Sequence, residues 1–294
     1  MPSSVQPDPS NLRKFAACVS ILLLIAMVAP GYAQDLASPL DTDRVGFVLG
    51  NVEFALLHEL AHLVIGEMDL PIIGPEEQAA DYLATMSLLR PLEIPPVGSE
   101  RWLEFALTTA DAFVILWQLG EKTGAVFPYW DSHALSIQRF YTIGCLLYGS
   151  SPDRFSAVPG LIEMPARRAE SCAAEYARAA RSIDWFLEAF GRKEGEPQKG
   201  VMTVRFEAPH SRISEYLVRE IQAAGLIDWT LQRLEELINL NADATVVLRS
   251  CSMPEAAWIP EERELVFCYE LLDLYYALSS AQDQHEIRSL LTRD

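Results

Sequence analysis

The chain has 294 residues, and its 41 acidic residues against 23 basic ones give a formal net charge of -18. A chain of this length can bury one large core or two smaller ones. Proteins that bind nucleic acid need a basic face toward the phosphates, so the acidic balance argues against nucleic acid as a partner.

The first 33 residues have the features of an export signal. Arg13 and Lys14 precede an apolar run at 15–28 that is short for a membrane span, and small residues at 31–33 suit a cleavage site. We therefore expect a signal peptide over residues 1–33 and a periplasmic or extracellular mature protein with no stable membrane span. The alternative is an uncleaved N-terminal anchor.

An H-E-x-x-H motif formed by His58, Glu59 and His62 is the strongest chemical signal in the chain. Residues 47–65 contain no proline and Gly66 follows as an expected cap, so the motif is predicted to lie on a helix. Residues four apart share a helix face, and both imidazoles can then reach one metal ion. The glutamate beside them can accept a proton from water without being a ligand. The alternative is a chance match, with both histidines hydrogen-bonded in a core.

A second helix is expected to begin near Pro75, which fits the first helical position. Glu76 and Glu77 suit the positive N-terminal end of that helix, and apolar residues continue to residue 89. Glu77 and Asp81 are four residues apart and share a face. The pattern alone leaves open whether these acids face the histidines or form an ordinary N-terminal charge cluster.

The two segments together resemble the gluzincin pattern, and in particular an uncharacterised bacterial family of zinc metallopeptidases, a domain of unknown function built around HEL[AG]H and E-x-x-A-D. The residues that carry the resemblance are 57–62, 69–71 and 77–81, with weaker support from 138–141 and 268–271.

The resemblance implies one zinc ion per chain, held by His58, His62 and Glu77. In gluzincins a glutamate on the second helix is the third ligand, and an acid one turn later orients a ligating histidine. Asp81 would then be the partner of His58, while Glu76 and Asp81 remain alternative third ligands. Two imidazoles, one carboxylate and an open position suit zinc better than magnesium or calcium.

Helical patterns follow at 100–121, 133–148 and 165–190, after a proline-rich loop at 91–98. His133 lies at the start of the second of these, behind an aromatic turn. A loop histidine can donate to the oxyanion of a tetrahedral intermediate, which makes His133 a candidate catalytic residue. The alternative is a helix cap or an exposed side chain.

Four cysteines lie beyond the expected signal peptide, namely Cys145, Cys172, Cys251 and Cys268. The absence of a C-x-x-C pair argues against a zinc knuckle or a redox motif. In an exported protein an even number of cysteines predicts disulfides, and we favour the sequence-local pairs 145–172 and 251–268 among the three possible connectivities. Four free thiols are the alternative.

Residues 191–200 are rich in glycine, proline and lysine and mark a possible internal boundary. Beyond it we expect strands at 202–207 and 245–251, one or two helices at 211–240 and a helix at 261–278. His210 and His285 have no partner at metal-ligand spacing and are interpreted as structural or surface residues.

The predicted fold is a predominantly helical α+β protein. A zincin-like active-site helix pair would lie within residues 34–195, and an α+β region at 196–294 would pack on it or form a small second lobe. The predicted function is an exported zinc metallopeptidase that cleaves peptide or protein substrates with Glu59 as general base. The alternative is an exported zinc-binding pseudo-enzyme that acts as a binding or scaffolding protein. Glu59 favours the enzyme, because degenerate sites often lose the base.

Overall fold

A computed structural model describes residues 42–90 and 99–280 of the chain. The expected signal peptide at 1–33, the proline-rich loop at 91–98 and His285 lie outside the described residues. The helices are α2 (Thr42–Glu67), α3 (Glu76–Leu89), α4 (Ser99–Thr123), α5 (Ser136–Ser150), α6 (Val158–Leu161), α7 (Ala166–Phe190), α8 (Arg212–Ala223), α9 (Leu226–Leu237) and α10 (Tyr269–Ser280). The strands are β1 (Met202–Phe206), β2 (Ala244–Arg249), β3 (Ala256–Ile259) and β4 (Glu264–Cys268). The predicted fold class, predominantly helical α+β, is confirmed.

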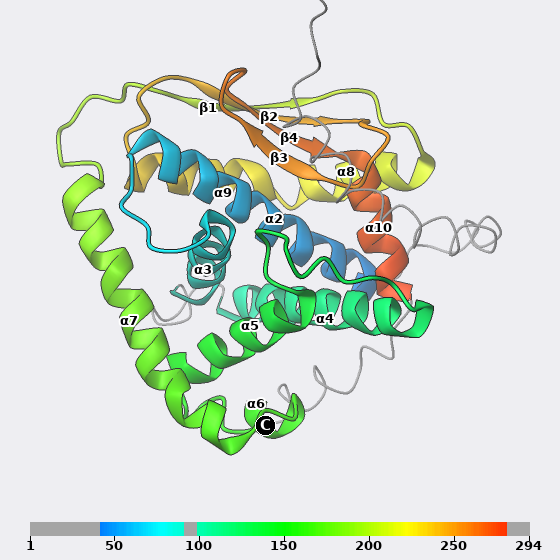
Figure 1. The fold of residues 1–294 in the computed structure, drawn as a ribbon. Coiled ribbons are helices and arrows are strands. Elements are labelled where there is room, and N and C mark those ends of the chain that lie inside the picture. The colour runs from blue at the N-terminus through cyan, green and yellow to red at the C-terminus, as the bar shows by residue number, and fades with distance from the viewer. Residues whose placement is uncertain (1–41, 91–98, 281–294) are drawn as a thin grey trace, which may run out of the picture.

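Helix α2 is the central element of the fold. Figure 1 shows the sheet, α8 and α9 on one side of α2, while α3, α4 and α5 lie on the other side. Its apolar residues Val48, Val52, Leu56 and Leu63 are at most 1% exposed. A helix that is apolar around most of its circumference must be covered on all sides, and these two layers cover it.

The four strands form one mixed sheet in the order β1-β2-β4-β3. The pairs β1–β2 and β2–β4 are parallel, whereas β3 runs antiparallel to β4. Strand β3 is therefore an edge strand, and it lies against α2. This arrangement brings the sheet edge to the helix that carries the H-E-x-x-H motif.

The helix predicted over 261–278 is wrong in its first half. Residues Glu264–Cys268 form β4, the helix begins only at Tyr269, and the preceding strand β3 was not predicted. Leu265 to Cys268 are all buried, because β4 lies inside the sheet. A short continuous apolar run is compatible with either a buried strand or a buried helix, so periodicity could not distinguish them.

Two predicted helix ends also differ from the structure. Gly66 lies inside the last turn of α2, and Asp69 takes the left-handed conformation (φ 47°) just beyond it. Aspartate tolerates this conformation better than most residues. Helix α5 begins at Ser136, so His133 lies in the loop before it.

Both predicted disulfides are present. Cys145 on α5 is joined to Cys172 on α7, and Cys251, just after β2, is joined to Cys268 at the end of β4. The second disulfide closes a segment that contains the whole of β3.

Two described helices are long and apolar enough to cross a membrane by length and composition alone, Arg44–Glu67 and Leu103–Thr123. In their most apolar windows, 72% and 56% of the residues are buried inside the protein. Core helices meet the same criterion, so burial in this fold is sufficient to explain their apolar character.

Candidate metal centre

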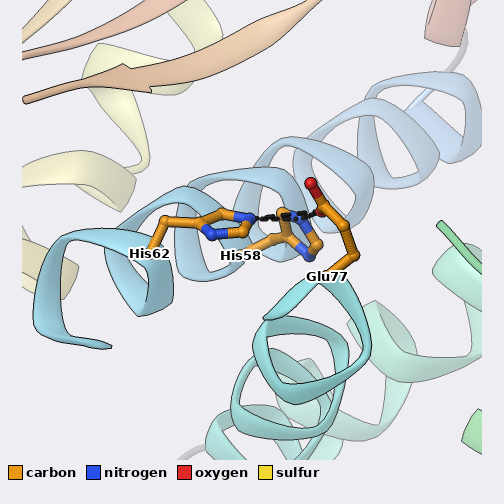
Figure 2. A group of neighbouring side chains, drawn as sticks. All are labelled: His58, His62 and Glu77. Atoms are coloured by element: carbon orange, nitrogen blue, oxygen red, sulfur yellow. Dashed lines mark hydrogen bonds and ion pairs between the residues drawn. The ribbon is translucent and has the colours of Figure 1, made fainter. Parts of the chain in front are cut away.

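Three side chains from two helices converge at one point. His58 and His62 lie one turn apart on α2, and Glu77 lies in the first turn of α3, whose N-terminal end faces α2 (Figure 2). His58 is 5% exposed. The short connection between the two helices therefore places a carboxylate opposite both imidazoles.

The three donor atoms are close to equidistant. His58 Nε2 lies 3.1 Å from Glu77 Oε2, His62 Nε2 lies 3.2 Å from the same oxygen, and the two Nε2 atoms lie 3.2 Å apart. Zinc with ligand bonds of about 2.0 to 2.2 Å in tetrahedral geometry separates its donors by roughly 3.4 Å. The donor set therefore fits a metal ion of this kind.

The other two acids occupy the outer nitrogens of the histidines. Asp81 Oδ1 lies 3.0 Å from His58 Nδ1, and Glu76 Oε1 lies 2.8 Å from His62 Nδ1. A carboxylate at Nδ1 favours the tautomer that leaves Nε2 as a free acceptor. Asp81 and Glu76 are thus placed to orient the imidazoles, and Glu77 is the acid that reaches both Nε2 atoms.

Arg139, on α5, contacts one of these acids, Asp81. Its Nη2 donates to Asp81 Oδ1, and its guanidinium lies 4.2 Å from the centre of the Phe113 ring. Arg139 falls within the segment 138–141 that supports the family resemblance, but the sequence did not indicate its role. A cation at this place keeps Asp81 ionised: burial would raise the pKa of Asp81, but His58 and Arg139 together hold it below its usual value.

His133 is also brought to the site. Its Nε2 lies 2.9 Å from Glu77 Oε2, and its Nδ1 lies 3.0 Å from Asp131 Oδ1. The main-chain N–H of His133 donates to the same Asp131 oxygen at 2.9 Å. The His133 side chain remains 47% exposed, so its ring borders both the metal donors and solvent. Asp131 was not predicted, although its spacing of two residues from His133 permits this contact.

The carboxylate of Glu59 is held by the edge strand of the sheet. Trp258 N, on β3, donates to Glu59 Oε2 at 2.8 Å. Burial raises the pKa of Glu59 above its ordinary value, against the lowering effect of His58, His62 and this N–H group. Trp258 was missed because it acts through a main-chain atom of a strand that was not predicted.

The electrostatics of the donor set favour a cation. Burial would raise the pKa of Glu77, but hydrogen bonds from His133, His58 and His62 hold it well below its usual value. Burial would lower the pKa of His62, but Glu77 and Glu76 raise it to about 9. Glu77 is therefore ionised, and the pocket between the rings stabilises positive charge, whether carried by protons or by a metal ion.

Two other clusters outside this site have simpler explanations. Cys251 and Cys268 lie close to Glu270, but their sulfur atoms are joined in a disulfide and offer no thiolate. His210 Nε2 lies 3.0 Å from Asp273 Oδ2, and Ser250 Oγ lies 3.1 Å from its Nδ1. The predicted structural role of His210 is consistent with this partly exposed ion pair.

Comparison with known proteins agrees with the chemistry of the site. A model of the family DUF4344, described as a putative metallopeptidase, matches residues 25–187. No curated protein and no solved structure matches the chain. The matched range contains the donors on α2 and α3 as well as His133, and it ends before β1. Because the match covers more than half of the chain, the protein belongs to this family of putative metallopeptidases.

Proposed function

We propose that this protein is an exported, zinc-dependent metallopeptidase that hydrolyses peptide bonds in peptide or protein substrates. The observation that carries the proposal is the convergence of His58 Nε2, His62 Nε2 and Glu77 Oε2, with separations of 3.1 to 3.2 Å, beside an uncoordinated glutamate. Membership of a metallopeptidase family supports the reaction class.

His58, His62 and Glu77 would hold one zinc ion per chain. Two imidazoles, one carboxylate and an open position are a typical catalytic zinc donor set. A zinc ion held there would supply Lewis acidity, which would make a nearby water more acidic and would polarise a substrate carbonyl. Asp81 and Glu76 would fix the two imidazole rings through their Nδ1 atoms.

Glu59 is the proposed general base. Its Oε2 is held by Trp258 N, and no hydrogen bond from the described residues reaches its Oε1. That oxygen can take a proton from the attacking water and later pass it to the leaving amine. The proton therefore leaves the nucleophile and returns to the product amine through one side chain.

His133 is the proposed donor to the oxyanion of the tetrahedral intermediate. Hydrogen bonding to Glu77 raises the pKa of His133 above its ordinary value, against the effect of burial, and Asp131 adds to this rise. In its protonated form, an imidazole held by Asp131 would present an N–H beside the donor atoms, where negative charge would develop on the substrate.

Export is a further part of the proposal. Disulfides persist in oxidising compartments, and the described residues form two. The intact mass of the secreted form tests the expected cleavage after Ala33. It should equal the mass of a chain that begins at Gln34.

The division of the mature chain near residue 195 into a zincin-like region and a C-terminal region also belongs to this proposal.

The test compares the wild type with Glu59→Gln on a mixed peptide library. The substitution keeps the size of the side chain and an oxygen to accept from Trp258 N, but it removes the basic oxygen. Peptidase activity should fall by about a hundredfold to ten-thousandfold. Metal content and melting temperature should remain close to those of the wild type.

Two outcomes would count against the proposal. Undiminished activity in Glu59→Gln would refute Glu59 as the base. Wild-type protein that is fully loaded with zinc and cleaves no peptide in the library would favour the pseudo-enzyme alternative, in which the site serves binding or scaffolding.

A further inference from the structure

The carboxylate proposed as general base is held by a part of the chain that lies beyond the matched family range. Glu59 is on α2, whereas its hydrogen-bond donor Trp258 is the third residue of β3, 199 positions later. The match ends at residue 187, before the first strand of the sheet. The two groups meet only because the sheet edge packs along α2.

The register of the sheet explains why this N–H is available. Trp258 pairs with Leu265 of the antiparallel neighbour β4. In an antiparallel pair, the N–H and C=O of one residue point together either toward the partner strand or away from it. The N–H of Trp258 bonds to Glu59, so it points away from β4 and toward α2. An edge strand has such unpaired donors, and here one of them meets a carboxylate.

The hairpin formed by β3 and β4 is also fixed to α2 at a second acid. Arg263, in the turn between the two strands, pairs with Glu67 near the end of α2. Its Nε and Nη2 also donate to the main-chain oxygens of Asp243 and Ala242, each at 2.7 Å. Glu67 lies eight residues beyond Glu59, or about 12 Å along the helix axis. Attachment at two points limits sliding of the strand along α2.

The Cys251–Cys268 disulfide adds a covalent restraint to the same segment. Its two cysteines lie on either side of β3 in the sequence, so the loop that it closes contains Trp258. Cys268 N also donates to Glu255 O at 3.0 Å, just before β3 begins. The position of the Trp258 N–H is thus set by the disulfide, the strand pairing and the Arg263 ion pair together.

We propose that the main-chain N–H of Trp258 is the positioning group for Glu59, so that the β3–β4 hairpin is a working part of the catalytic site. This inference rests on the proposed peptidase function. By holding Oε2, the N–H fixes the orientation of the carboxylate and leaves Oε1 for proton transfer. The contribution comes from the backbone of the strand, and the Trp258 side chain is not needed for it.

Proline substitution can remove this one donor. Proline lacks the N–H, and it is tolerated on an edge strand where the N–H faces away from the sheet. Trp258→Ala is the matched control, since it loses the same side chain but keeps the N–H. We expect kcat of Trp258→Pro to be about tenfold to a hundredfold below that of Trp258→Ala, as for loss of one hydrogen bond to a charged group.

The other readouts separate positioning from general damage. KM should differ by less than about threefold between the two variants, and both should retain one metal ion per chain, because the donors on α2 and α3 are unchanged. Equal kcat values in two folded, metal-loaded variants would overturn the proposal. So would loss of the metal in Trp258→Pro alone, since the hairpin would then support the donors and not the base.

A second measurement does not depend on the proline variant. The Trp258 amide should be protected from hydrogen exchange in the wild type, and it should exchange at least about tenfold faster in Glu59→Ala, which removes the acceptor. The amide of Val266, inside the sheet, is the reference. An unchanged Trp258 rate would show that Glu59 does not engage this N–H in solution. Because this readout needs no turnover, it distinguishes failure of this inference from failure of the proposed function.

Discussion

Two regions of the molecule contribute different kinds of atoms to the candidate site. The helix pair α2 and α3, inside the matched family range, contributes side-chain donors, with their imidazoles oriented by neighbouring acids. The sheet beyond residue 187 contributes a main-chain N–H that holds Glu59. Metal binding should therefore depend on which side chains the first region carries. The orientation of Glu59, the proposed base, should depend on where the second region places its backbone.

This difference predicts two separable kinds of defect. Substitutions of the proposed donors should lower the metal content. Substitutions in the β3–β4 hairpin should instead lower kcat of the metal-loaded protein.

The largest effect is expected from removal of a donor. His62→Ala and Glu77→Ala should reduce the metal content from one ion per chain to nearly none, with loss of peptidase activity, because each removes one of the three proposed ligands. Metal analysis after dialysis measures this directly.

Asp81→Asn is the informative comparison for that experiment. It removes a carboxylate that orients His58 and should weaken metal affinity by about ten- to a hundredfold, while metal still binds at saturation. If Glu77→Ala keeps its metal and Asp81→Asn does not, Asp81 is the third ligand and our assignment is wrong.

A smaller effect is expected at His133. His133→Ala should lower kcat by about a hundredfold, the usual contribution of one oxyanion donor, with the metal retained. His210→Ala changes a histidine of the distant ion pair with Asp273 and serves as the matched control, for which no change in kcat is expected. Loss of metal in His133→Ala would show that this residue acts as a ligand.

The donor chemistry could be predicted from the sequence because it resides in side chains at fixed helical spacing. Helical spacing indicated His58, Glu59 and His62, and the resemblance to the gluzincin pattern added Glu77. The structure brings the three proposed donors together. Asp131 and Arg139 were missed, since their roles depend on how α5 and its preceding loop pack against α3. The structure supplied the partners that the motif alone could not.

The sheet region was harder to predict for a physical reason. The buried segment 265–268 is continuously apolar and matches a helix as well as a strand, so β4 and its neighbour β3 were not identified. Trp258 donates through its main chain, and any residue other than proline has the same N–H. No pattern of side chains could have indicated this contact.

The two disulfides provide a matched pair for the comparison between regions. Replacing either pair of cysteines with serine should cost about 3 to 4 kcal/mol of unfolding free energy, because loops of similar size are released. Only the Cys251/Cys268 double variant should also lower kcat, by several-fold, since its loop contains Trp258. Denaturant unfolding and steady-state kinetics measure the two effects. Equal loss of kcat in both double variants would contradict a specific role for the hairpin.

The smallest effect concerns the contact between α2 and α9. Glu53 is fully buried and its Oε1 lies 2.8 Å from Thr230 Oγ1. Burial raises the pKa of Glu53 from 4.5 to about 7, against the effects of Thr230 and Arg101. A folded-state pKa raised in this way gives stability that is complete below about pH 4.5 and is lost as the pH rises through 7.

Glu53→Gln should therefore be more stable than the wild type at pH 8, by up to about 3 kcal/mol, and close to it at pH 4.5. Urea unfolding at the two pH values gives the comparison. Glu215→Gln, on the exposed face of α8, is the control and should change stability by less than about 0.5 kcal/mol at either pH. A Glu53→Gln effect that is the same at both pH values would show that Glu53 does not titrate in this range.

The most direct test is a crystal structure of the zinc-loaded protein with anomalous diffraction recorded at the zinc edge. We predict one peak per chain, about 2.0 to 2.2 Å from His58 Nε2, His62 Nε2 and a carboxylate oxygen of Glu77, with Glu59 bonded to Trp258 N and not to the metal. A peak coordinated by Asp81 or Glu76, a peak bound by Glu59, or the absence of a peak between α2 and α3 would contradict the account.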